Sequence, residues 1–474
     1  MSGAVADLVI IGCGPAGMAA ACEARALNLS VVLLDEQATI GGQIYRSIES
    51  APAERLHVLG QDYASGRSLA LDFRNSGARY LAGAIVWNVA WDGTVDYVAN
   101  GRSEMVIGKH VLLASGAMER PFPITGWTLP GVMGAGAGQI LLKGSGALPT
   151  SPVVLAGCGP LLYLLAWQYL RAGVTIRALV DTTTMSAYLH AARHLAGALR
   201  GWPDLVKGIK LLAALRRHGV PAFSGCSELS IEGEKQVEGF SFKHRGRTVR
   251  VPASLLLLHQ GVVPNTQLSW SIGSAHRWSP DQLCWQPVTD PWGRLGESPI
   301  YVAGDSRAIV GAQASAVQGR LAALAIGERL GVMSDLAQRA APLQRQLKRY
   351  THIRPFLDAL YRPRNENRIP QSDSVLVCRC EEVTAGQIRR YVELGCLGPN
   401  QTKAFGRCGM GPCQGRFCGL TVTEVIAQAR GVEPCDVGYY RVRPPIKPVT
   451  LGELGAVNQR IQTEIPSPIR EETE

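Results

Sequence analysis

The chain has 474 residues, which is too long for one compact core and indicates two or three domains. Hydrophobic residues make up 46% and charged residues 18%, a balance that excludes an intrinsically disordered chain. The 12 cysteines are too sparse for a disulfide scaffold, and the net charge of +10 comes without a nucleic-acid-binding motif, so we expect no nucleic-acid partner.

The first forty-five residues are typical of a strand, a glycine turn, a helix and a second strand. An apolar strand over 8–11 leads into Gly12-Cys-Gly-Pro-Ala-Gly17, and a helix over 18–27 precedes a strand over 31–34 that Asp35 closes. Such a GxGxxG turn lets the backbone approach a pyrophosphate, and the acid accepts a hydrogen bond from a ribose hydroxyl. This unit predicts a dinucleotide site.

The same plan recurs later in the chain. A strand over 153–156 leads into Gly157-Cys-Gly159, followed by a helix over 161–170 and a strand that ends at Asp181. Leu162 occupies the third glycine position, so this helix cannot approach its strand as closely. Gly157 and Gly159 are therefore candidates for a nicotinamide nucleotide or another nucleotide, and an empty structural domain stays open.

The sequence indicates neither an N-terminal targeting peptide nor a transmembrane segment. No basic segment or cleavage site precedes the apolar run after Asp7, and Pro152 and Pro160 divide the uncharged window 147–170. We expect a cytoplasmic protein without a transmembrane segment, in which a reducing environment favours metal or cluster ligation over disulfides.

Several motifs resemble the two-dinucleotide-domain flavoproteins, the superfamily of the glutathione and thioredoxin reductases. Gly41-Gly42-Gln43 resembles the loop along the flavin, Ala114-Ser-Gly116 is similar to the crossover strand, and Gly304-Asp305 resembles the motif that binds the ribityl chain. The helix that begins near Gly311 would point its N-terminus at the isoalloxazine. The resemblance implies FAD, with these residues around it: Gly12, Gly14, Pro15, Ala16, Gly17, Asp35, Glu36, Gly42, Gln43, Ala114, Ser115, Gly116, Gly304, Asp305, Gly311 and Ala312. No redox-active cysteine pair accompanies them.

Cysteines gather beyond residue 371. Cys378 and Cys380 form a C-x-C pair, and Cys413 and Cys418 follow as C-x4-C after 32 intervening residues. Four thiolates suit zinc or an iron–sulfur cluster equally by ligand number. Cys408 is an alternate ligand.

This pattern resembles the bacterioferritin-associated-ferredoxin-like domain, a small helical module that binds a 2Fe–2S cluster. The segment Gly409-Met-Gly-Pro-Cys-Gln-Gly415 is characteristic of that module when it is fused to flavoproteins. The resemblance implies a 2Fe–2S cluster on the four cysteines, with zinc or no metal as the alternatives. Thr384 is the expected N-cap of a helix over 384–394.

The predicted fold class is α/β, with two Rossmann-like dinucleotide-binding domains and a small helical 2Fe–2S domain. We expect an FAD-binding domain over 1–125 and 266–335, a second nucleotide-binding domain over 126–265, and a basic linker over 336–374. The 2Fe–2S domain covers 375–436 and an extended tail covers 437–474.

Along nearly its whole length the chain resembles the large FAD-containing subunits of octopine and nopaline oxidases, hydrogen cyanide synthase and hetero-oligomeric proline or hydroxyproline dehydrogenases. The resemblance implies that a smaller FAD-containing partner subunit oxidises the C–N bond of an amino-acid-like substrate. This subunit would relay the electrons to a quinone-type acceptor. Features of the group include FMN at a subunit contact, ATP in the second nucleotide domain, a small ferredoxin-like third subunit, and a peripheral place at the inner membrane face.

Two other functions stay open. One is a self-sufficient NAD(P)H-dependent flavin reductase that feeds a ferredoxin-like acceptor, and the other is a structural nucleotide-binding subunit. No general base stands out among the nine histidines, so the catalytic residues are unknown and we expect no substrate oxidation by the chain alone.

Overall fold

The first nucleotide unit forms a seven-stranded sheet with helices against it. The computed structural model describes residues 5–456, and the strand order is β3-β2-β1-β6-β5-β4, with β19 parallel to β6. The strands are β1 (Val5–Ile11), β2 (Val31–Asp35), β3 (Arg79–Ala82), β4 (Ile85–Val89), β5 (Thr94–Ala99), β6 (Arg102–Leu113) and β19 (Ile300–Val302). Because β1 is central and covered on both faces, its apolar run over 8–11 is uninterrupted.

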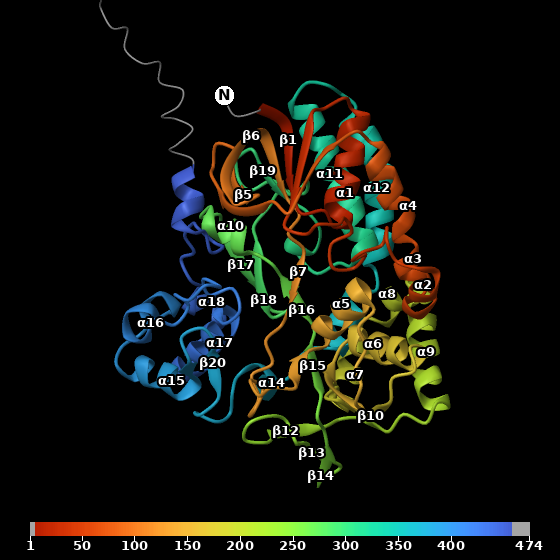
Figure 1. The fold of residues 1–474 in the computed structure, drawn as a ribbon, viewed down its shortest axis with the longest axis vertical. Coiled ribbons are helices and arrows are strands. Elements are labelled where there is room, and N and C mark those ends of the chain that lie inside the picture. The colour runs from red at the N-terminus through yellow and green to blue at the C-terminus, as the bar shows by residue number, and fades with distance from the viewer. Residues whose placement is uncertain (1–4, 457–474) are drawn as a thin grey trace, which may run out of the picture.

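Helices α1 and α11 pack closely together beside this sheet (Figure 1). The helices of this unit are α1 (Pro15–Ala26), α2 (Ala53–Leu59), α3 (Gln61–Ala64), α4 (Gly66–Asn75) and α11 (Ala312–Arg329). Strands β4, β5 and β6 pair antiparallel and make the crossover. Beyond them lie the elements that we call the crossover region: β7 (Ala117–Glu119), β16 (Val262–Pro264), α10 (Gln267–Ser271), β17 (His276–Ser279) and β18 (Cys284–Pro287).

The second nucleotide unit has a parallel sheet of its own, in the order β11-β10-β9-β15-β8. Its strands are β8 (Val132–Gly134), β9 (Val153–Cys158), β10 (Ile176–Asp181), β11 (Ala222–Phe223) and β15 (Leu256–Gln260), and an antiparallel sheet of β12 (Ser227–Glu232), β13 (Gly239–His244) and β14 (Arg247–Pro252) extends from it. The helices are α5 (Ala135–Ser145), α6 (Pro160–Arg171), α7 (Met185–Ala192), α8 (Leu195–Arg200) and α9 (Trp202–Arg217). Two Rossmann-like units, the second inserted in the first, are thus confirmed.

The cysteine-rich region folds as a small, mostly helical module that lies beside both nucleotide units (Figure 1, blue). Its elements are β20 (Leu376–Cys378), β21 (Val383–Thr384), α15 (Ala385–Glu393), α16 (Pro399–Gly406), α17 (Gly419–Arg430) and α18 (Pro434–Val437). The Thr384 hydroxyl accepts a hydrogen bond from the Gln387 backbone N–H, and the Gln387 side-chain oxygen accepts one from the Thr384 backbone N–H. This capping box confirms the predicted start of α15.

The basic segment over 336–374 departs from the linker that we expected. It folds as α12 (Leu336–Thr351), α13 (Arg354–Leu360) and α14 (Asn365–Arg368), and α12 packs against α11. Some of its arginines find partners within the molecule: Arg354 pairs with Asp358 and Arg368 pairs with Glu424. Leu343 and Leu360 are buried and hold these helices against the nucleotide units. The expectation of a linker rested on the basic charge of the segment and did not consider these apolar residues.

The tail follows the expected extended path for only part of its length. Ile446 N donates to Trp87 O at 3.0 Å, and Lys447 Nζ pairs with Glu36 at 2.6 Å. Residues 451–456 are helical instead, because Thr450 and Glu453 form a cap beyond Pro448. The rest of the predicted tail, 457–474, lies outside the described residues. Within 5–456 no helix is long and apolar enough to cross a membrane.

We predict that Gly319→Ala lowers the free energy of unfolding by about 1–3 kcal/mol or more, because overpacking at a backbone contact cannot relax. A Cβ there would lie 2.1 Å from the carbonyl oxygen of Ala16 on α1. The control is Gly208→Ala on α9, where a Cβ meets nothing within 4 Å; it should stabilise by about 0.5–1 kcal/mol. Urea denaturation of the purified variants measures both. Equal stability of the two variants would contradict the prediction.

Candidate functional site

The first glycine turn is set by close backbone contacts. A Cβ on Gly12 would lie 2.4 Å from Ala114 O, and one on Gly17 would lie 1.9 Å from Gly12 O. Both glycines are therefore required for β1, β6 and the start of α1 to approach one another. The N-terminus of α1 faces the turn, where its free N–H groups favour a phosphate.

Asp35 supports this turn from the end of β2. Its carboxylate accepts from Cys13 N at 2.5 Å and from Gln37 N at 2.7 Å, and burial raises its pKa. The neighbouring Glu36 points instead to the tail, where Lys447 lowers its pKa against the effect of burial. Asp35 is thus buried at the turn, while Glu36 joins the tail to the first unit.

The other flavin candidates gather at the same carboxyl edge of the first sheet. A Cβ on Gly42 would lie 2.8 Å from Gly14 Cα, and one on Gly304 would lie 3.0 Å from the Ala16 side chain. Asp305 Oδ1 accepts from Val310 N and Gly311 N at 2.8 and 2.9 Å. These contacts bring together most of the predicted residues, from the segments after β1, β2, β6 and β19: Gly12, Gly14, Ala16, Gly17, Asp35, Gly42, Ala114, Ser115, Gly304, Asp305 and Gly311. Pro15, Gln43, Gly116 and Ala312 are their neighbours in the chain, whereas Glu36 is directed to Lys447. This glycine-lined cradle with two helix N-termini fits a dinucleotide such as FAD.

A buried lysine that sequence reasoning missed supports the Gln43 loop. Lys143 Nζ on α5 donates to Gln43 O at 3.2 Å and to Gln139 Oε1 at 2.8 Å. Burial lowers the pKa of Lys143 to about 7. Gln139 in turn donates to Gln168 of α6 at 2.9 Å. This chain of polar contacts joins the second unit to the flavin loop, and no motif in the sequence marks it.

The second glycine turn is occupied by side chains of this protein. His259 lies over Gly159, whose Cβ would be 3.2 Å from the imidazole, and its Nδ1 contacts Glu119 Oε1 at 2.7 Å. The Tyr163 hydroxyl donates to Asp181 at 2.7 Å. That acid corresponds to Asp35 of the first unit, so its carboxylate already has a partner.

The segment after α13 also covers this second turn. Cys158 Sγ, between Gly157 and Gly159, contacts Tyr361 O at 3.5 Å, and the Tyr361 and Tyr163 rings lie 6.3 Å apart. Side chains of this protein therefore already contact the residues of the second turn.

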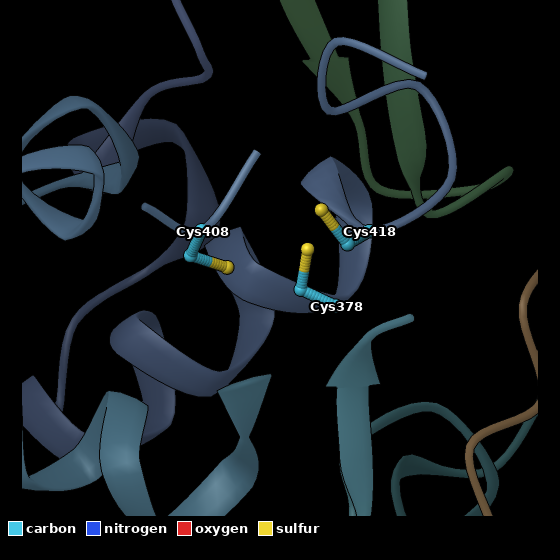
Figure 2. Close-up of side chains that lie close together, drawn as sticks. All are labelled: Cys378, Cys408 and Cys418. Atoms are coloured by element: carbon cyan, nitrogen blue, oxygen red, sulfur yellow. The ribbon is translucent and has the colours of Figure 1, made fainter. Parts of the chain in front are cut away.

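Three cysteines meet in the interior of the module. The Sγ atoms of Cys378, Cys408 and Cys418 lie within 4.8 Å of one another and all three residues are buried. Figure 2 shows their sulfurs pointing into a shared space. Hydrogen bonds from Cys408 and Cys418 lower the pKa of the Cys378 thiol to about 2, so a thiolate is favoured there, the form that binds metals.

The two remaining candidates form a second pair at the same place. Cys380 is hydrogen-bonded to the Cys413 thiol and backbone N–H, and both side chains are more exposed than the buried three. The C-x-C and C-x4-C segments are therefore joined twice, by Cys378 with Cys418 and by Cys380 with Cys413. Two adjacent thiol pairs suit a two-iron cluster, which takes two thiolates per iron. Thiols are the right donors for the predicted cluster, but the group whose sulfurs all lie within 4.8 Å contains the alternate ligand Cys408 and neither Cys380 nor Cys413.

Tyr440 closes the module over the fifth cysteine. Its hydroxyl donates to Cys408 Sγ at 3.3 Å, and Cβ atoms on Gly409 and Gly415 would lie 2.5 Å from its ring. This contact explains both glycines of the Gly409–Gly415 segment and adds a hydrogen bond to the Cys408 sulfur. The sequence showed the glycines but not the ring that requires them.

Stacked aromatic residues connect the crossover region to the module. Trp270 stacks on Tyr439 with ring centroids 5.1 Å apart, and Trp285 meets Trp270 edge-on at 5.8 Å. Tyr439 reaches the backbone of Gly415, between Cys413 and Cys418, at 3.4 Å. The cavity at this junction, lined by Met118, Trp285 and Tyr439 among others, measures about 30 Å³, room for about one water molecule.

The comparisons with known proteins agree with this architecture. Residues 6–325 match the family described as pyridine nucleotide-disulphide oxidoreductase, and 373–458 match the sarcosine oxidase A3 domain. The chain is 47% identical to the A subunit of opine oxidase from Rhizobium meliloti, over 94% of this chain and 87% of that protein. It is 30% identical to hydrogen cyanide synthase subunit HcnB of Pseudomonas protegens, over 96% and 98%. L-proline dehydrogenase from P. horikoshii shares the fold, with a TM-score of 0.70 and 21% identity over 95% of this chain and 79% of that one.

The fold and its first glycine turn define a flavin-dependent oxidoreductase of the pyridine nucleotide-disulphide class. More specifically, the chain belongs to the family of opine oxidase A subunits. It is therefore an oxidoreductase subunit, as the sequence predicted, and the family that its nucleotide units match supports FAD as a cofactor.

The pH dependence of stability should reflect His276, which stacks on Trp270 with centroids 3.7 Å apart. Burial lowers the pKa of His276 to about 4, so the folded chain keeps it neutral while the unfolded chain protonates it near its ordinary value. Its contribution is present above pH 6.5 and is lost as the pH falls toward 4, which amounts to about 2 kcal/mol at pH 5.

His276→Phe keeps the stack but removes this titration. Between pH 7.5 and pH 5, the variant should lose about 2 kcal/mol less stability to urea than the unaltered chain. Both proteins retain His110, whose pKa burial also lowers to about 4, so the difference isolates His276. Identical pH sensitivity in the two proteins would refute the assignment.

Proposed function

We propose that this chain is the FAD- and 2Fe–2S-containing electron-transfer subunit of a multi-subunit opine or amino-acid oxidase. A smaller FAD-containing partner subunit would oxidise the substrate's C–N bond, and this subunit would pass the electrons toward a quinone-type acceptor. Opine oxidase and hydrogen cyanide synthase relatives, named as subunits of such enzymes, support the hetero-oligomer. The partner subunit, not this chain, would recognise the substrate.

The observation that carries the proposal is the aromatic contact between the crossover region and the cysteine pairs. Trp285, Trp270 and Tyr439 link β18, α10 and the module through ring contacts with centroids 5.8 and 5.1 Å apart. FAD accepts electrons in pairs and a 2Fe–2S cluster accepts them singly, so the two groups together would divide a hydride equivalent into single electrons. The protein's part is to fix the two sites close together and exclude solvent between them.

The residues of the first unit would bind FAD at Gly12–Gly17, Asp35 and the Asp305 motif, in the domain over 1–125 and 266–335. The module over 375–436 would bind the cluster through Cys378, Cys380, Cys413 and Cys418. Gly157 and Gly159 belong to the second nucleotide domain, over 126–265, and their coverage by His259 and Tyr361 argues for a structural role there. The alternative for that turn is bound ATP or NAD(P). A further FMN could bind at a subunit contact, and mass analysis of the released cofactors would identify each of these groups.

Purification of the complex from its native host tests the proposal directly. The visible spectrum and mass analysis of released cofactors should show FAD, iron and sulfide with this chain, together with a second flavin-containing subunit. A peripheral place at the inner membrane face should appear as salt-extractable association with membranes. Substrate oxidation by the purified chain alone at normal enzymatic rates would overturn the relay.

Replacement of single cysteines should distinguish ligands from structural cysteines. We expect Cys413→Ser and Cys418→Ser to lose most of the iron and the visible cluster absorption, because each leaves one iron with an incomplete thiolate set. Cys408→Ser distinguishes the two possible ligand sets: retained iron supports the four predicted cysteines, and lost iron makes Cys408 a ligand, since its sulfur lies within 4.8 Å of those of Cys378 and Cys418. Cys435→Ser, at an exposed position on α18, is the control. Iron analysis per chain measures all four, and zinc in place of iron would contradict the cluster.

Anaerobic mixing with NADH should leave the flavin absorbance unchanged over seconds. The reason is that His259, Tyr163 and Tyr361 occupy the contacts that a nicotinamide nucleotide needs in the second unit. Dithionite, which needs no binding site, is the positive control and should bleach the flavin. Bleaching by NADH at a similar speed would favour the self-sufficient reductase instead.

A further inference from the structure

Three cations line a groove on the module's surface. The groove has a volume of about 510 Å³ and is lined by Asn400, Lys403, Gly409, Met410, Gln414, Arg441 and Arg443. Lys403, Arg441 and Arg443 form no ion pair with any residue in the described part of the chain. The positive charge of this surface, which we call the cationic groove, is therefore not neutralised from within the module.

The cations of the groove repel one another. Burial and the nearby Arg443 guanidinium both lower the pKa of Lys403. Lys403 Nζ finds only the carbonyl oxygen of Arg441, at 3.1 Å, and the face of the Tyr440 ring, 5.1 Å from its centroid. An anionic partner would relieve this repulsion, so the groove favours carboxylates or another anion.

The groove lies directly outside the cysteine pairs. Gly409, Met410 and Gln414 belong to the loop that carries Cys408 and Cys413. Beneath Lys403 lies the Tyr440 ring, whose hydroxyl contacts Cys408 Sγ at 3.3 Å. One layer of side chains thus separates the groove from the buried sulfurs, which makes this face the short route between the metal centre and a partner outside.

The surroundings suit a protein more than a small anion. Exposed apolar side chains stand on α16 and its neighbouring loops: Leu397 is 59% exposed, Phe405 45% and Met410 43%. Such apolar residues beside cations are typical of a protein interface. The groove has no aromatic wall open to solvent, because Tyr440 is only 1% exposed, and a planar cofactor would lack a stacking surface.

We propose that the cationic groove docks an acidic one-electron carrier protein that accepts electrons from this module. The inference rests on the proposed relay function. With a cluster bound by the module's cysteines, one electron would pass from the reduced cluster to the oxidised centre of the carrier, without bond formation or proton transfer. The carrier would then stand between this chain and its terminal acceptor.

The test uses the full chain with two probes of opposite charge, an acidic plant-type ferredoxin and a basic c-type cytochrome. We compare the triple variant Lys403→Glu, Arg441→Glu, Arg443→Glu with a control of equal charge change on exposed positions of the second unit, Lys210→Glu, Lys235→Glu, Arg247→Glu. Calorimetric binding isotherms at low and high salt give the dissociation constants. Arg443→Glu alone, at a side chain without internal hydrogen bonds in the described structure, repeats the comparison without disturbing the contact of Lys403 with Arg441.

The groove variant should weaken ferredoxin binding at least tenfold at low salt while the control changes it less than threefold, and salt should weaken binding to the unaltered chain. The cytochrome should not bind the groove. Equal weakening by both variants, or saturable binding of FMN or inorganic phosphate that only the groove variant loses, would overturn the proposal.

Failure of the relay and failure of the docking surface are separate results. The iron content and visible spectrum of the same preparations report on the metal centre, whereas the isotherms report on the groove and require no metal. A chain without iron that still binds ferredoxin through the groove supports the docking surface and removes the relay. A chain with its cluster that binds no ferredoxin overturns the docking surface alone.

Discussion

The structure depends on the close approach of backbones around the start of α1. Gly17 brings α1 against β1, and Gly319 brings α11 against Ala16 on the opposite side. Because α1 is fixed between them, the N-termini of α1 and α11 reach the same edge of the first sheet as Gly42 and Asp305. A side chain larger than hydrogen at either contact would separate these elements and open the cradle that they form.

The two nucleotide units show how one plan serves two purposes. In the first unit, Gly17 allows helix α1 to lie close to the backbone of the turn at Gly12. In the second, Leu162 and Tyr163 follow the turn, and Tyr163 uses its hydroxyl on Asp181. The second unit thereby becomes a packed platform: α5 supports the Gln43 loop through Lys143, and the turn receives Tyr361. The inserted unit therefore supports the first unit through side chains of its own.

Local patterns in the sequence predicted what local contacts determine. Both βαβ units, the Thr384 cap and the grouping of cysteines follow from short-range spacing, and the structure has the units and the cap. The helices of the basic segment were missed because their stability comes from distant residues, such as Glu424 opposite Arg368. Lys143 and Tyr440 could not be found for the same reason, since each acts on a loop far away in the chain.

The module is joined to the nucleotide units as part of one folded body. Trp127 donates to Leu376 O at 2.8 Å, and Gln267 donates to Gln414 O at 2.8 Å. Arg379 lies over both Trp127 and Phe417. Most of these contacts use backbone carbonyls or ring faces, which bind without a full charge and so lose little at physiological salt. A module attached in this way keeps the distance between its cysteines and the crossover region constant, which a relay by a mobile domain could not.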